Sequence, residues 1–147
     1  MECQTVSLAG INQLYIAPIT GSSINYTYTG EQVFLNQVFD WESIEFDNAT
    51  FNQKKTKDAR GTFFNKVIDI TVGDFMNEYI EPYEDASIIV IIVDNNGNSW
   101  VSGHEYPYSL DKHEGTTGGD NNQLAFNLVQ NSYLKVEPLN TASVILP

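Results

Sequence analysis

The chain has 147 residues, enough for one domain with a hydrophobic core. Its formal net charge of −12 argues against binding DNA phosphates or an anionic membrane, because both need basic surfaces. A single cysteine, Cys3, excludes an internal disulfide, and no apolar run approaches the ~20 residues of a membrane-spanning helix. The first residues, Met1 to Gln4, lack the basic and apolar regions of a signal peptide. We therefore expect one soluble domain over residues 1–147.

Alternation of apolar and polar residues with a period of two predicts strands along the first half of the chain. The longest candidate covers residues 61–72, where the even positions are apolar and would face the core, with Lys66 as the exception. Residues 50–57 are polar and rich in lysine, which is typical of an edge strand. The strands expected here are 13–17, 24–29, 39–46, 50–57 and 61–72.

The middle of the chain predicts one helix and one hairpin. Apolar residues recur at helical spacing over 75–83, with Asp74 as a suitable N-cap and Pro82 as the point where the helix ends or kinks. The β-branched run that follows leads into Asp-Asn-Asn-Gly at 94–97 and then into a second strand pattern. Asn-Gly between two strand patterns predicts a tight hairpin over residues 87–102, because glycine tolerates the positive φ of the turn.

A turn-rich stretch over residues 103–122 predicts a long loop, of the kind that is often functional. Strand patterns resume at 124–128, 133–136 and 142–146. In all, about eight strands and one helix predict a mostly-β fold, a sandwich or barrel with one flanking α-helix.

The charges are unevenly distributed along the chain. An acidic stretch is followed by a basic stretch that holds four of the seven lysines and arginines. One interpretation is that two solvated strand faces form cross-strand ion pairs. The other is that a basic edge of one subunit meets an acidic edge of its neighbour. The candidate subunit contacts are Asp40, Glu42, Glu45, Asp47, Lys54, Lys55, Lys57 and Arg60.

The expected long loop concentrates residues that are able to bind metals. Eight residues separate its two histidines, which matches no standard zinc spacing. A solvated loop explains these residues more simply, so we expect no metal site. The Asp-x-Asn-x-Asn pattern from residue 94 lacks the glycine that a calcium loop requires at its sixth position, and a hairpin turn accounts for it. The loop residues concerned are His104, Glu105, Asp111, Lys112, His113 and Glu114.

Nothing in the sequence indicates catalysis. There is no nucleophile elbow and no phosphate-binding loop, so we expect no catalytic residue, no cofactor and no enzymatic activity. Trp41 and Trp100 have the chemistry to stack on sugars, but both lie in strand patterns where packing in a core is the simpler interpretation.

The order of these turn and strand signatures resembles that of virion structural proteins of tailed bacteriophages that infect Bacteroidetes, including crAss-like phages. The resemblance covers about residues 10–126, and its motifs are structural, not catalytic. Those motifs are the N-terminal cysteine, Gly10-Ile11 before Leu14-Tyr15-Ile16, Gly61-Thr62-Phe63-Phe64, the run into Asp94-Asn95-Asn96-Gly97, and Gly119-Asp120 before Leu124-Ala125-Phe126.

The resemblance implies a tail-tube or neck-ring (head–tail connector) subunit with a tail-tube-like β-sandwich. Such a subunit would form a closed ring of about six or twelve copies and contact neighbouring virion proteins. DNA would pass through the ring without specific binding, and residues 103–122 would contact the next ring. The protein would be assembled in the host cytoplasm and located in the virion, in the tail or the neck.

Two other functions stay open. The chain is also compatible with a β-sandwich module of a phage adhesion apparatus that binds a glycan or a protein, in which case Trp100 is the first residue to test. An enzyme with a dispersed site is the third possibility, and it requires carboxylates or histidines that converge in a pocket.

Overall fold

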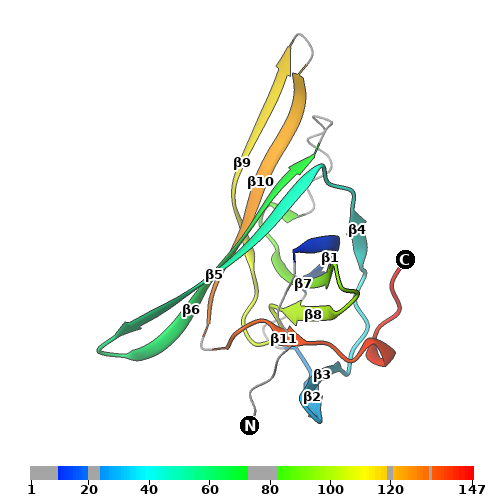
Figure 1. Cartoon of the computed structure of the whole chain (residues 1–147), viewed down its shortest axis with the longest axis vertical. Coiled ribbons are helices and arrows are strands. Elements are labelled where there is room, and N and C mark those ends of the chain that lie inside the picture. Colours follow the sequence, from blue (N-terminus) through cyan, green and yellow to red (C-terminus); the bar gives the residue numbers. More distant parts are fainter. Residues whose placement is uncertain (1–9, 20–23, 73–82, 119–120, 133) are drawn as a thin grey trace.

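The computed structural model describes residues 10–19, 24–72, 83–118, 121–132 and 134–147, and it is mostly β (Figure 1). Its strands are β1 (Ile11–Ile19), β2 (Tyr26–Thr29), β3 (Gln32–Leu35), β4 (Glu42–Ile44), β5 (Asn48–Asp58), β6 (Gly61–Val72), β7 (Ser87–Asp94), β8 (Ser99–Ser102), β9 (Ser109–Gly118), β10 (Asn121–Ser132) and β11 (Glu137–Pro138). A short 3₁₀ helix, η3, covers Thr141–Ser143.

The strands form three antiparallel sheets. One has five strands in the order β11-β8-β7-β1-β4, the second has four in the order β5-β6-β10-β9, and the third is the β2–β3 hairpin. The mostly-β, sandwich-like architecture predicted from the sequence is therefore confirmed. The number of strands in the described part of the chain is larger than expected, because several of them are only two to four residues long.

Strand β7 is buried on both of its faces. Its even residues, Ile88, Val90 and Ile92, belong to a core between the five-stranded and four-stranded sheets. Its odd residues, Ile89 and Ile91, belong to a second core on the opposite face. The continuous β-branched run in the sequence is typical of a strand that is covered on both sides.

The two cores have different coverings. The first is closed by inward residues of β6 and β10, which pair in continuous antiparallel register from Leu124 opposite Val72 to Ser132 opposite Phe64. The second is closed by β3 and by the C-terminal segment, through residues such as Val33 and Leu139. The central five-stranded sheet is thus the middle layer of three.

The hairpin predicted at 87–102 is confirmed. The Asp94 carboxylate accepts hydrogen bonds from the backbone N–H groups of Asn96 and Asn98, both at 2.9 Å, and from the Trp100 indole N–H at 3.0 Å. Gly97 adopts a φ of 84°, as the turn requires. These contacts explain the acidic and amide residues of the turn without a calcium ion.

The prediction of a long loop over residues 103–122 is wrong for most of that range. Residues 109–118 form β9, which pairs with β10 in a long hairpin that extends beyond the core (Figure 1). This strand lacks the apolar alternation by which sequence analysis recognises strands. Its backbone hydrogen bonds to β10 order it instead.

Other predicted elements have mixed outcomes. Strand 50–57 is confirmed as the edge strand β5, and strand 61–72 coincides with β6. Only three residues of 39–46 pair as a strand, and 142–146 forms none. The helix expected over 74–82 lies outside the described residues, and the described part of the chain contains no α-helix.

The double burial of β7 makes a testable prediction. Replacing Ile89→Ala, at a site with no exposed surface, should lower the free energy of unfolding by about 2–5 kcal/mol, because it opens a cavity in the second core. The matched control is Ile145→Ala, where the side chain is 93% exposed and the expected change is within about 0.5 kcal/mol. Denaturant unfolding measures both, and equal effects would contradict the three-layer arrangement.

Candidate functional site

The acidic and basic stretches identified in the sequence lie at different places on the fold. The acidic residues surround β4, an edge strand of the five-stranded sheet, and lead into the start of β5. The basic residues lie toward the other end of β5, and Lys54 is about six residues, or roughly 20 Å, beyond Asn48. The side chains of the acidic and basic candidates are exposed.

Cross-strand ion pairs do not explain the basic stretch. The β6 residues opposite Lys54, Lys55 and Lys57 are Asn65, Phe64 and Thr62, none of which is acidic. Among the described residues, these three lysines have no ion-pair partner. Arg60 differs from them, since it pairs with Asp58 at 2.9 Å within the β5–β6 turn. The lysines therefore remain available for a contact with another molecule.

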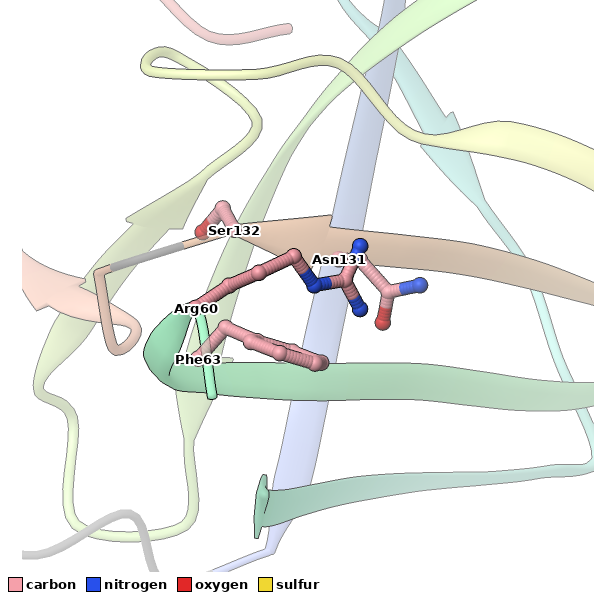
Figure 2. Close-up of a pocket in the computed structure, with 4 residues that line it drawn as sticks. All are labelled: Arg60, Phe63, Asn131 and Ser132. Carbon is pink, nitrogen blue, oxygen red and sulfur yellow. The ribbon is translucent and has the colours of Figure 1, made fainter. Parts of the chain in front are cut away.

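Arg60 lines one side of a small open pocket at this turn. Its guanidinium lies 5.7 Å from the centre of the Phe63 ring, and Asn131 and Ser132 complete the lining (Figure 2). The pocket has a volume of about 210 Å³. A pocket this small is below the ~300 Å³ typical of ligand sites, so it offers room for a side chain more readily than for a cofactor.

The six residues expected to share one solvated loop lie in two different parts of the structure. His104 is buried, with only 3% of its surface exposed, so the solvated-loop interpretation is wrong for this residue. Asp111, Lys112, His113 and Glu114 belong to β9, where His113 stands opposite Phe126 in the register with β10. The six residues therefore do not form one loop surface.

The turn into His104 depends on a glycine. Gly103 has a φ of +98°, and a Cβ at this position would lie 2.9 Å from the Ile88 carbonyl oxygen. Five residues later, Tyr108 and Ile88 exchange two backbone hydrogen bonds of 2.9 Å. Residues 103–108 are therefore held tightly against β7. Of the two residues after Gly103, Glu105 reaches Lys66 of the four-stranded sheet, whereas the His104 ring packs on Tyr26.

A buried polar cluster begins at one end of the space between the two large sheets and continues, through His104 and Glu137, to the other face of the five-stranded sheet. From β6 and β10 come Lys66 and Gln130, which are direct cross-strand neighbours, and Ser132. From the five-stranded sheet come Ser102 and Glu137, and the segment after β8 adds the remaining members. We call this group the polar cluster, and it consists of Lys66, Ser102, His104, Glu105, Tyr108, Gln130, Ser132 and Glu137.

Lys66 is fully buried and uses all three of its donors. Its ammonium donates to Ser132 Oγ at 3.2 Å and, at 3.4 Å each, to Ser102 Oγ and Glu105 Oε1. Burial lowers the pKa of the Lys66 ammonium, and the Glu105 carboxylate opposes that shift. Lys66, the one polar residue among the inward-facing even positions from 64 to 72 of β6, therefore faces inward like the others and has a buried carboxylate partner.

The carboxylate of Glu105 lies at the centre of the polar cluster. Besides Lys66, its Oε1 accepts from Gln130 Nε2 at 2.6 Å and from Ser132 Oγ at 3.3 Å. Gln130 Nε2 also donates to the Tyr106 carbonyl. These contacts fix one oxygen of Glu105 and leave its Oε2 pointing toward His104.

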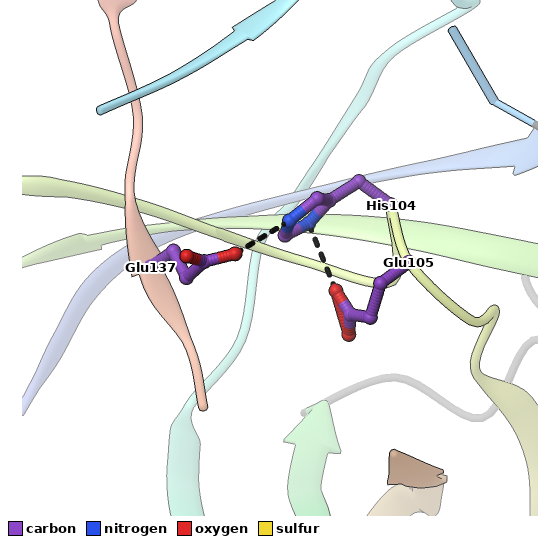
Figure 3. A group of neighbouring side chains, drawn as sticks. All are labelled: His104, Glu105 and Glu137. Carbon is purple, nitrogen blue, oxygen red and sulfur yellow. Dashed lines mark hydrogen bonds and ion pairs between the residues drawn. The ribbon is translucent and has the colours of Figure 1, made fainter. Parts of the chain in front are cut away.

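His104 lies between two carboxylates (Figure 3). Its Nε2 is 2.9 Å from Glu137 Oε1, and its Nδ1 is 3.1 Å from Glu105 Oε2. Glu137 Oε1 also accepts from the Tyr28 hydroxyl at 2.8 Å. Burial and this hydrogen bond raise the pKa of the Tyr28 phenol above its ordinary value. The histidine thus connects the segment after β8 to β11.

The polar cluster contains a serine and a lysine at the distance of a nucleophile and base, but the serine is already occupied. Ser132 Oγ accepts from the Leu134 backbone N–H at 3.2 Å, and its single hydroxyl proton is shared between the Leu134 carbonyl at 3.1 Å and Glu105 Oε1 at 3.3 Å. With Lys66 as a further donor, its lone pairs are used in the structure. The geometry therefore favours a structural role for Ser132 over nucleophilic catalysis.

Sequence analysis missed the polar cluster, although a signal was present. The inward positions of β10 change from Leu124, Phe126 and Leu128 to Gln130 and Ser132, at the level where β6 changes to Lys66. Polar residues at inward positions on two neighbouring strands indicate a buried polar group that needs partners. The partners themselves come from distant segments, which periodicity cannot identify.

No family model, curated protein or solved structure matches this chain. Within the described residues, no helix has the length and apolar character needed to cross a membrane.

The buried ion pair predicts a stability effect. Lys66→Met should lower the free energy of unfolding by about 3–5 kcal/mol, because it leaves the Glu105 carboxylate buried without its ammonium partner. Adding Glu105→Gln to Lys66→Met should recover part of that loss, since no unpaired charge then remains. Lys135→Met, at an exposed lysine, is the control. A Lys66→Met loss no larger than the control would contradict the role given to the pair.

Proposed function

We propose that this chain is a structural subunit that assembles with copies of itself into a closed ring, as a tail-tube or neck-ring subunit of a tailed-phage virion. The main support is the four-stranded sheet, whose two outer strands each have one partner among the described strands. β5 pairs with β6 and β9 pairs with β10, which leaves two long edges. Unpaired edges are ready sites for adding a strand from another chain.

The two edges lie on opposite sides of the same sheet. β5 has 11 residues and β9 has 10, so each edge extends over roughly 35 Å. If β5 of one copy pairs with β9 of the next, the contact is head-to-tail and uses two different surfaces. Contacts of this kind generate a ring when the rotation between copies closes. A single edge-to-edge interface would therefore pair both of the free strand edges, that of β5 and that of β9.

The lysines of β5 would give this contact its selectivity. Lysine on an edge strand discourages pairing with an arbitrary partner, because its charge must be solvated or matched. Lys54, Lys55 and Lys57 lack an acidic residue opposite them on β6. The acidic residues of β9 in a neighbouring copy, Asp111 and Glu114, would supply the opposite charge.

The net charge of the chain supports the proposed passage of DNA. A ring with a charge of −12 per subunit repels phosphates on average, so a duplex would meet walls that do not bind it. Neighbouring virion proteins would then contact the ends of the ring, and the β9–β10 hairpin, which extends beyond the core, is suited to reach one of them (Figure 1).

The alternative of a glycan-binding module loses its leading residue. Trp100 is only 6% exposed, and its indole N–H is bound by Asp94. A tryptophan in this position stabilises the hairpin and has no free face for a sugar ring. Self-assembly is therefore the better-supported proposal.

The ring proposal predicts the native mass of the protein. Purified protein at high concentration should give closed rings by native mass spectrometry and negative-stain electron microscopy, alone or with neighbouring virion proteins. A particle that stays monomeric under all of these conditions would count against assembly as the function.

Charge reversal on β5 tests the interface itself. The variant Lys54→Glu/Lys55→Glu/Lys57→Glu should weaken assembly about tenfold or more at low salt, because the attraction to acidic residues of the next copy becomes repulsion. Circular dichroism should show an unchanged fold, since all three side chains are exposed. Glu84→Lys, at an exposed carboxylate outside β5, is the control for charge reversal elsewhere on the chain. Assembly that is identical at low and high salt in the variant and in the unmodified chain would exclude the charged contact.

A further inference from the structure

Two buried atoms of the polar cluster face each other without a hydrogen bond. His104 Nδ1 and Glu105 Oε2 are 3.1 Å apart, yet neither has a hydrogen-bond partner in the structure. The His104 side chain has no exposed surface, and the Glu105 side chain is 9% exposed. Buried polar atoms normally have partners, because an unsatisfied buried group costs about 1–3 kcal/mol. This pair therefore calls for an explanation.

The other contacts of the two residues determine what the pair can bind. The Glu137 carboxylate can only accept, so Nε2 carries a proton, and in a neutral imidazole Nδ1 then has a lone pair. Glu105 Oε1 is held by Lys66, Gln130 and Ser132, so Oε2 is the free oxygen of this carboxylate. Two electron-rich atoms then face one another, and a positively charged species between them would satisfy both.

The geometry favours a metal ion over a proton at this position. A proton on Nδ1 would need Oε2 near the N–H axis, whereas the contact at 3.1 Å is too far off that axis to form a hydrogen bond. A metal on the Nδ1 lone pair needs the opposite arrangement, with the oxygen to one side. With both ligand bonds at about 2.1 Å, ligand atoms 3.1 Å apart subtend about 95° at the metal, which a zinc site accommodates.

We propose that His104 Nδ1 and Glu105 Oε2 bind a first-row divalent metal ion of the Zn²⁺ type, with the Glu137 carboxylate orienting the imidazole from its other nitrogen. One ligand atom from each of these three residues lies within 4.8 Å of the others. A carboxylate that accepts from the second nitrogen of a ligating histidine is the usual outer-shell arrangement of zinc sites. Water would complete the coordination sphere.

Access and ligand type are consistent with this proposal. The two ligand atoms are buried, but the Glu105 side chain is 9% exposed and lines an open pocket of about 390 Å³, which gives access from the surface. One imidazole and one carboxylate suit zinc and its neighbours better than calcium or magnesium, which prefer oxygen ligands alone. A bound ion would fix the segment after β8 and, through His104, its contact with β11. This site is independent of the proposed assembly through β5 and β9.

Titration of the full-length chain with ZnCl₂ after chelator treatment tests the proposal. Calorimetry should give one Zn²⁺ per chain, and the melting temperature should rise as Zn²⁺ is added, because the ion binds the folded state. His104→Gln and Glu105→Gln should each weaken Zn²⁺ binding roughly tenfold or more. The controls are His113→Gln, which removes the other histidine, and Glu84→Gln, which removes an exposed carboxylate, and both should bind as the unmodified chain does.

Three results would overturn the site: no Zn²⁺ binding by the unmodified chain, binding that both cluster variants retain, or binding lost only in His113→Gln. If the cluster variants fail to fold, nitrogen NMR of the unmodified chain decides the question. The Nδ1 resonance of His104 should shift to that of a metal-bound nitrogen at one equivalent of Zn²⁺. A His104 resonance that does not change with Zn²⁺ would show that Nδ1 is not a ligand.

Discussion

Strands β1 and β7 carry apolar side chains on both of their faces, and each face needs its own cover. Leu14 and Ile16 of β1 enter the core beneath the four-stranded sheet, while Tyr15 and Ala17 enter the core on the opposite side. Each fully buried aliphatic side chain contributes about 1.5–3 kcal/mol, so exposing either face would cost most of the stability of a domain this size. The chain meets this constraint by placing the four-stranded sheet on one side and β3 with the C-terminal segment on the other.

The polar cluster lies where the apolar cover ends. Inward positions on β6 and β10 change from aliphatic residues to Lys66 and Gln130. The N–H groups of both side chains donate to the distant segment that holds Ser102 and Glu105, and Lys66 also donates to Ser132. A buried charge pair of this kind adds little net stability, but it penalises arrangements in which a partner is missing. The polar cluster therefore helps to fix one register between the two large sheets and one position for β11, on which the proposed metal site also depends.

Local patterns predicted the elements that their own residues specify. The Asp-Asn-Asn-Gly turn and the alternation in β6 are encoded by neighbouring residues, and both appear in the structure as expected. β9 could not be predicted, because its pairing with β10, and not its own side-chain pattern, makes it a strand. The burial of His104 could not be predicted from local sequence either, because it depends on the contact with Glu137, 33 residues away, and on the turn at Gly103. Features that depend on contacts between distant segments cannot be predicted from the periodicity of one segment.

The central claim of the functional account is that copies join through the free edges of the four-stranded sheet. Hydrogen exchange of the assembled and the dissociated protein, followed by mass spectrometry, examines those edges directly. Outward-facing backbone amides of β5 and β9 should exchange slowly only in the assembly, whereas amides of β7, already bonded within the central sheet, should exchange equally slowly in both states. Exchange in β5 and β9 that is the same before and after assembly would contradict an edge-to-edge interface.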